Sequence, residues 1–119
     1  MTERHSVFLP GLRLRIFLGE SQEWHGKPLA QALLELAWNQ GIAGATVFKG
    51  VEGFGPEHYL STERLPDVAV NLPVVVEMID REAAIERLLP LLDEMVPRGM
   101  ITTTPVRILQ RGAREGKKR

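Results

Sequence analysis

Residues 12–18 read LRLRIFL, and polar and apolar residues alternate along most of this stretch. In a strand, successive side chains point to opposite faces, so four apolar side chains would share one face: Leu12, Leu14, Ile16 and Leu18. The opposite face would carry Arg13, Arg15 and Phe17. The pattern predicts a strand with one face in the core and a second face that is partly charged.

Outward from this strand, three more segments have strand character, at residues 45–51, 73–79 and 100–109. Apolar residues recur at helical spacing over residues 29–37 and 85–96, with Pro28 suited to a first helical turn. The order is therefore βαββαβ, which is the ferredoxin-like motif. We expect an α+β fold in which two helices cover one face of a four-stranded antiparallel sheet, with strand order 4-1-3-2.

Three residues or runs refine this expectation. Three consecutive valines, residues 74–76, suggest a third strand that is buried on both faces. Asp80 is a suitable N-cap for the second helix. Pro105 lies within the fourth strand, and because proline cannot donate a ladder hydrogen bond, it predicts an edge position or a bulge.

Length and composition favour one globular domain over residues 1–110 of the 119, since 44% of the residues are hydrophobic and 25% are charged. The formal net charge is zero but uneven. Residues 111–119 hold five basic residues and one acidic residue, which predicts a basic, disordered tail. The remaining chain is mildly acidic, so no nucleic-acid partner is expected.

Several function classes find little support in the sequence. The chain has no cysteine, which removes disulfides and thiolate chemistry. No apolar run is long enough to cross a bilayer and no signal-peptide pattern occurs, so we expect a cytoplasmic protein. No nucleophile motif, Walker sequence or dinucleotide fingerprint is present, so we expect a binding protein rather than an enzyme.

Two helices can cover only one face of the sheet, and the uncovered face is not simply polar. It would carry Arg13, Arg15 and Phe17 beside residues of the third strand, either Val75, Glu77 and Ile79 or their alternates. Arg15 and Glu77 could pair across adjacent strands. A sheet face that mixes apolar and charged residues in this way favours an oligomer over a monomer.

The strongest local signal for a ligand is GVEGFG at residues 50–55, which closely follows a strand and opens a long loop over residues 52–72. Glycines allow the backbone to approach a ligand, and successive N–H groups can hold an anion. Phe54 could stack on a ring or fill the core. Arg98 and Gly99, before the fourth strand, form a second loop with a cation. In a ring of ferredoxin-like subunits, these two loops from neighbouring subunits can face one cleft.

These segments, with WHGKPL at residues 24–29, GATV at 44–47 and LPVVVE at 72–77, resemble the PII-like family of proteins long known as a domain of unknown function. The resemblance covers about residues 8–110. It implies a homotrimer whose open sheet faces turn inward, a small-molecule ligand (an adenine nucleotide in PII proteins) in the clefts between subunits, and a loop that docks on a client such as a membrane transporter or a regulator. Thr46 and the run Gly53, Phe54 and Gly55 match the PII pattern, and the resemblance implies that they bind the ligand. With Arg98 and Gly99 of the second loop, they are the expected ligand-binding residues.

This sequence also departs from the PII pattern. The spacing from Thr46 to Gly53 is one residue longer, and the PII phosphate loop Gly-Asp-Gly-Lys is missing, which leaves AMP, ADP, a cyclic nucleotide or another small anion open. No certain cofactor and no native metal site are expected. The alternatives are a divalent-metal-binding trimer that resembles cation-tolerance proteins and uses His25 and His58, and a small enzyme that uses Glu52 or His25 as acid or base.

Overall fold

The structure, a computed structural model, describes residues 6–56, 61–62 and 71–111. Four longer strands form one sheet in the order β4-β7-β1-β8, and every pairing is antiparallel. The strands are β1 (Ser6–Gly19), β4 (Gly44–Lys49), β7 (Pro73–Arg81) and β8 (Met100–Arg111). Counted in chain order, β1, β4, β7 and β8 are the first to fourth strands of the prediction, so the sheet has the predicted order 4-1-3-2 when it is read from β8. Pro105 lies on the edge strand β8, as expected.

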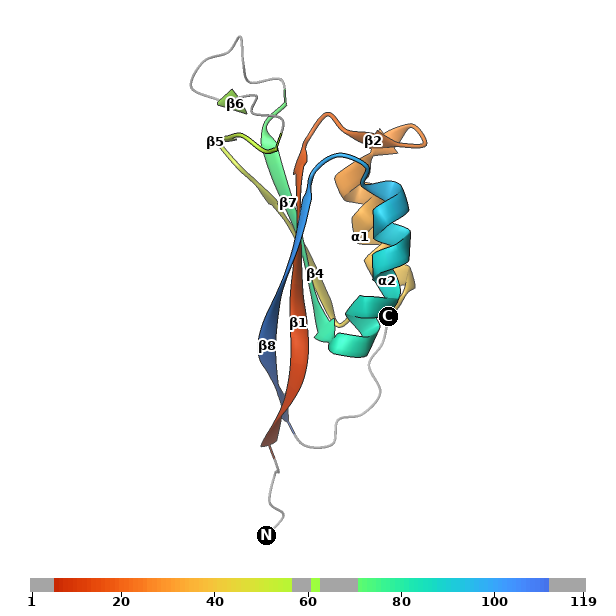
Figure 1. The fold of residues 1–119 in the computed structure, drawn as a ribbon, viewed down its shortest axis with the longest axis vertical. Helices are drawn as coiled ribbons and strands as arrows, with labels where there is room; N and C mark the ends of the chain where they lie inside the picture. The colour runs from red at the N-terminus through yellow and green to blue at the C-terminus, as the bar shows by residue number, and fades with distance from the viewer. Residues whose placement is uncertain (1–5, 57–60, 63–70, 112–119) are drawn as a thin grey trace.

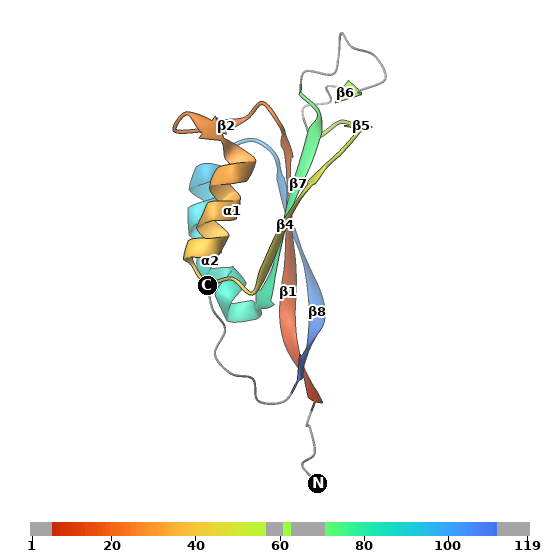
Figure 2. The same ribbon diagram turned by 180° about the vertical axis from the view of Figure 1, so that it is seen from behind.

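Two helices, α1 (Leu29–Asn39) and α2 (Glu82–Met95), lie on the same side of this sheet, as Figures 1 and 2 show. The core between the two layers is formed by the predicted face of β1, alternate residues of β7 and the apolar stripes of both helices. Its fully buried members include Leu14, Ile16, Val76, Met78, Leu33, Ile85, Leu88 and Leu92. The predicted α+β, ferredoxin-like fold is confirmed.

Short hairpins lie in segments expected to be irregular. β2 (Glu23–Trp24) pairs with β3 (Lys27–Pro28), so Pro28 ends a strand and precedes α1 as its N-cap residue. β5 (Glu52–Gly53) pairs with β6 (Ser61–Thr62) inside the predicted loop 52–72. Residues 57–60, which include His58, and residues 63–70 of that loop lie outside the described residues, as do His5 and residues 112–119 of the predicted tail.

Two expectations about β7 and its following residues are wrong. Burial alternates along β7, with Val74, Val76 and Met78 buried but Val75 only half-buried, because the helices cover one sheet face alone. Asp80 does not cap α2, because β7 continues through it by pairing with Leu12. Its carboxylate instead accepts hydrogen bonds from the backbone N–H of Arg81 at 2.7 Å and of Ala43 at 3.0 Å.

The sheet face opposite the helices is called the open face below, and neither helix of the described residues lies on it (Figures 1 and 2). The register places Arg15 between Glu77 on β7 and Thr102 on β8, and Thr46 beside Glu77 on β4. Two residues further along β1 and on the same face, Phe17 lies between Val75 on β7 and Met100 on β8. In the part of the chain that is described, no helix is long and apolar enough to span a membrane.

Candidate functional site

A pocket lies at the end of the sheet where β1 ends and β7 begins, beside the turn that leads into β8. Five of the six predicted ligand-binding residues line it: Gly53, Phe54, Gly55, Arg98 and Gly99. They come from two loops that are more than forty positions apart in the sequence, and the sheet topology brings the loops together. The pocket therefore brings the two loops together within one chain, whereas they were expected to face one cleft from neighbouring subunits.

Thr46 lies elsewhere. It is an exposed residue of β4, paired with Glu77 on the open face, and it does not line the pocket. The role of all six residues as ligand contacts stays a prediction. Because Thr46 lies on the open face and outside the pocket, a ligand of the pocket could reach a Thr46 only in a cleft that also includes an open face.

Phe17 connects the pocket to the open face. It follows Arg13 and Arg15 on the same face of β1 and also forms part of the pocket wall. Pro73 and Val74, at the start of β7, line the pocket as well. The pocket therefore lies at the margin of the open face and shares Phe17 with it.

Two glycines give the pocket its shape. Gly99 has φ +130°, a conformation that other residues rarely adopt, and a Cβ there would lie 2.7 Å from the backbone oxygen of Phe17. A Cβ on Gly19 would lie 2.3 Å from Oδ1 of Asn71. Side chains at these positions would displace either the strand end or the Asn71 carboxamide, so glycine is required for this arrangement.

Two carboxamides join the loops around the pocket. Gln22 accepts a hydrogen bond from the backbone N–H of Gly19 at 2.9 Å through Oε1, and donates through Nε2 to the backbone oxygen of Arg98 at 3.1 Å. Asn71 accepts through Oδ1 from the backbone N–H of Ser21 at 2.9 Å. Gln22 therefore connects the end of β1 to the turn before β8, and Asn71 connects the start of β7 to the same end of β1.

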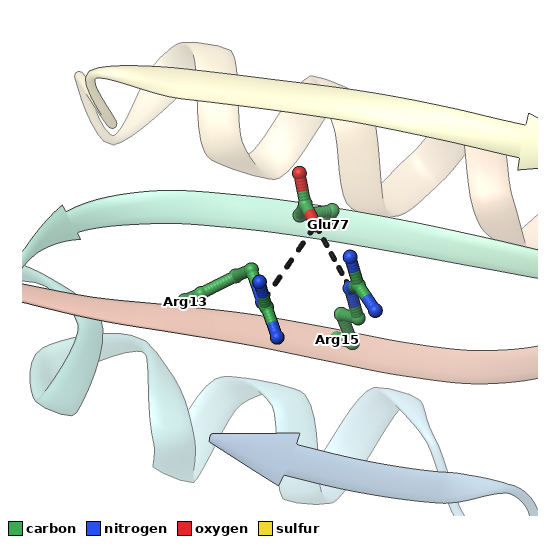
Figure 3. Close-up of polar contacts among 3 residues, drawn as sticks. All are labelled: Arg13, Arg15 and Glu77. Atoms are coloured by element: carbon green, nitrogen blue, oxygen red, sulfur yellow. Dashed lines mark hydrogen bonds and ion pairs between the residues drawn. The ribbon is translucent and has the colours of Figure 1, made fainter. Parts of the chain in front are cut away.

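The open face carries a charged cluster of Arg13, Arg15 and Glu77 (Figure 3). Arg15 Nε donates to Glu77 Oε1 at 2.8 Å, and Arg13 Nε lies 3.9 Å from the same oxygen. The predicted pairing of Arg15 with Glu77 is confirmed. Arg13 Nε is buried without a hydrogen-bond acceptor among the described residues, so the cluster has one positive charge in excess and one donor to spare.

The hairpin before α1 presents an aromatic pair and an ion pair. The rings of Trp24 and His25 lie 4.4 Å apart, and Trp24 also packs on the core. Lys27 Nζ lies 2.8 Å from Glu35 Oε1, and hydrogen bonds from Lys27 and then Gln31 lower the pKa of the exposed Glu35 carboxyl. No group of three or more potential metal ligands occurs within residues 6–56, 61–62 and 71–111.

Sequence reasoning missed Gln22 and Asn71 as residues of the pocket. Neither belongs to a periodic pattern, and each acts through hydrogen bonds to backbone groups that the sequence cannot place. The only available signal was position: Asn71 lies two residues before β7, which begins at Pro73, and Gln22 comes directly before β2, which begins at Glu23.

Comparisons with known proteins agree with this architecture. A UPF0166 protein from Aquifex aeolicus is 39% identical over 98 residues, which cover 81% of this chain and 90% of that protein. The UPF0166 protein MJ1524 from Methanocaldococcus jannaschii is 35% identical over 92 residues, covering 76% of this chain and 84% of that protein.

Among solved structures, CPII from Thiomonas intermedia K12 bound to ADP, AMP and acetate superposes with a TM-score of 0.62 at 14% identity, covering 86% of this chain and 91% of that chain. Its apo form, described as a nitrogen regulatory PII-like protein, gives a TM-score of 0.61 at 13% identity and covers 89% and 99%. At these identities the likeness shows a shared fold.

The family comparison covers nearly the whole sheet and both helices. The family DUF190, described as "Uncharacterized ACR, COG1993", matches residues 11–108, which run from β1 into β8. Together with the two UPF0166 relatives, this match shows that the chain belongs to the DUF190 family.

Proposed function

We propose that this protein is a PII-like signalling protein that binds an adenine nucleotide in clefts between the subunits of a homotrimer. The observation that carries the proposal is the pocket at the margin of the open face, because it gathers five of the predicted ligand-binding residues around a place that a second chain would close. The fold neighbour CPII is bound to ADP, AMP and acetate.

The pocket chemistry suits a ligand with a flat ring and a negative charge. Phe17, Phe54 and Pro73 offer apolar surface for a ring, and Phe54 is 64% exposed in the single chain. The guanidinium of Arg98 can pair with a phosphate group. The glycines at 53, 55 and 99 let the backbone approach the ligand closely.

The open face supports the trimer. Phe17, Val75 and Ile79 are half-buried although no helix or strand within residues 6–56, 61–62 and 71–111 lies over them, and Phe48 and Met100 beside them are 49% and 44% exposed. A continuous face of this kind, with an unsatisfied charged cluster at its centre, is typical of a subunit interface. Closed cyclic symmetry lets every copy use this same face.

The output would pass through the segment at residues 52–72, which has Gly53 near its start and Asn71 near its end in the wall of the pocket. A ligand held between these two ends would bias the conformation of the segment. A client such as a membrane transporter or a regulator would bind one conformation more tightly than the other. The proposal assigns no catalysis to the protein.

Thermal denaturation with added nucleotides tests the proposal. AMP, ADP, ATP and cyclic AMP are each titrated to millimolar concentration, with inorganic phosphate as the comparison. A ligand that binds only the native state raises the melting temperature with its concentration. At least one adenine nucleotide is expected to do so, and R98A should lose most of the rise while the exposed-arginine control R87A keeps it.

No rise with any of the four nucleotides would refute the nucleotide proposal. An equal rise with inorganic phosphate alone would show that the pocket selects an anion and not an adenine ring.

A further inference from the structure

The carboxamides of Gln22 and Asn71 line the pocket, and they differ in which hydrogen-bonding groups remain without a partner. Both amide ends of Gln22 are occupied, the oxygen by Gly19 N–H and the nitrogen by the Arg98 carbonyl. The Asn71 oxygen is occupied by Ser21 N–H, whereas Asn71 Nδ2 has no acceptor among the described residues. Gln22 is therefore a structural brace, and Asn71 keeps a pair of N–H donors available beside the cavity.

The orientation of the Asn71 carboxamide is fixed by its surroundings. A backbone N–H can be met only by the amide oxygen, so the bond from Ser21 at 2.9 Å settles which end is Oδ1 and which is Nδ2. Gly19 leaves the space that the carboxamide fills, since a Cβ there would lie 2.3 Å from Oδ1 and 2.6 Å from Nδ2. A donor whose direction is set in advance loses little conformational freedom on binding.

We propose that Asn71 is a ligand-recognition residue of this pocket, whose Nδ2 donates a hydrogen bond to an acceptor atom of the bound nucleotide. The inference rests on the proposed function and adds to it the residue that selects for an acceptor. Nucleotides suit such a site because ring nitrogens and phosphate oxygens are all acceptors. Selection follows because a ligand without an acceptor would leave a desolvated donor unpaired.

The substitution N71D separates recognition from structure. Aspartate keeps an oxygen for Ser21 N–H and nearly the same shape, but replaces the donor group with an acceptor. Binding of ADP, measured by isothermal titration calorimetry on the full chain, is expected to weaken by about tenfold or more, as for a lost hydrogen bond with an unpaired partner. The variant N71A should weaken ADP binding similarly and should also lower the melting temperature of the ligand-free protein, since the Ser21 bond is lost.

Two controls test whether the negative charge introduced by N71D, and not the loss of the donor, weakens ADP binding. N39D makes the same chemical change at an exposed position at the end of α1, outside the pocket, and should bind ADP as the wild type does. The titrations are repeated at about 0.1 M and about 1 M salt, because repulsion between an exposed carboxylate and a phosphate is screened at high salt while a missing donor is not. The loss in N71D is expected to persist at high salt.

Three results would overturn the inference. N71D binding within about twofold of the wild type, which is below the effect of one hydrogen bond, would show that Asn71 has a structural role alone. A loss that disappears at high salt would assign the effect to charge. If the wild type binds none of AMP, ADP, ATP and cyclic AMP, this inference is overturned together with the proposed function, whereas the first two results would leave the proposed function standing.

Discussion

The substitution E77Q tests how the open face is used, because Glu77 is the one carboxylate of the charged cluster and is shared by Arg13 and Arg15. At about 4 Å and an effective dielectric constant of about 20, one such pair attracts by about 4 kcal/mol before desolvation and entropy are counted. In the single chain the Arg15 side chain is 39% exposed and that of Glu77 is 15% exposed, so solvent reduces the net value to about 1 kcal/mol.

A covered open face changes this value. When a second chain excludes water from the cluster, loss of the carboxylate leaves two guanidinium groups uncompensated, which costs about 3–5 kcal/mol per chain for a buried pair. The loss of the Glu77 carboxylate therefore costs at least about 2 kcal/mol more per chain in the assembled protein than in the single chain, and this difference weakens assembly. Since 1.4 kcal/mol corresponds to a factor of ten, assembly should weaken by more than about tenfold for each chain incorporated.

Sedimentation velocity across micromolar concentrations measures this effect. The wild type is expected to stay assembled where E77Q dissociates to single chains. The control E86Q makes the same change at an exposed position on α2, and should sediment as the wild type does. If E77Q and E86Q assemble equally well, the open face is not the subunit interface, and the reasoning from its charges is refuted.

Three further predictions follow from single contacts. G99A should lower the free energy of unfolding by about 2 kcal/mol in urea titrations, because its Cβ would lie 2.7 Å from the Phe17 backbone oxygen at φ +130°. The control G26A, at φ +84° with no atom within 4 Å, should lower this free energy by less. Equal losses in the two variants would contradict the close approach at Gly99. Q22L should lower it by about 1–2 kcal/mol by leaving the Gly19 N–H and the Arg98 carbonyl without their bonds, and an unchanged urea midpoint would show that neither bond stabilises the fold. The pKa of Glu35 is lowered in the folded chain, so its contribution to stability is present above the unfolded-state pKa and is lost as the pH falls through the folded-state pKa. E35Q should therefore flatten the acid side of a plot of unfolding free energy against pH. An unchanged slope on the acid side would refute this.

The main sheet was predictable because its signals are periodic. Alternation over residues 12–18 identifies the buried face of β1, and the antiparallel order that follows places Arg15 opposite Glu77, as the structure shows. The three-valine run was misleading, since β-branched residues suit a half-covered strand as well as a fully buried one. Asp80 was misread because pairing with Leu12 extends β7, and sheet hydrogen bonds outweigh a local capping preference.

The pocket was predictable in part. Glycines next to an aromatic residue after a strand mark a backbone that approaches something closely, and this signal found residues 53–55. The braces Gln22 and Asn71 could not be found, because their partners are backbone groups of Arg98 and Ser21, 76 and 50 positions away. The hairpin of β2 and β3 was missed because strands of two residues are too short to show a period.

Native mass spectrometry of the wild-type chain with ADP tests the proposed function most directly, since it reads the number of chains and the number of bound nucleotides in one spectrum. We expect a species of three times the chain mass of 13.3 kDa that takes up ADP to one molecule per chain. A single 13.3 kDa chain without ADP, under conditions in which the protein is folded, would contradict it.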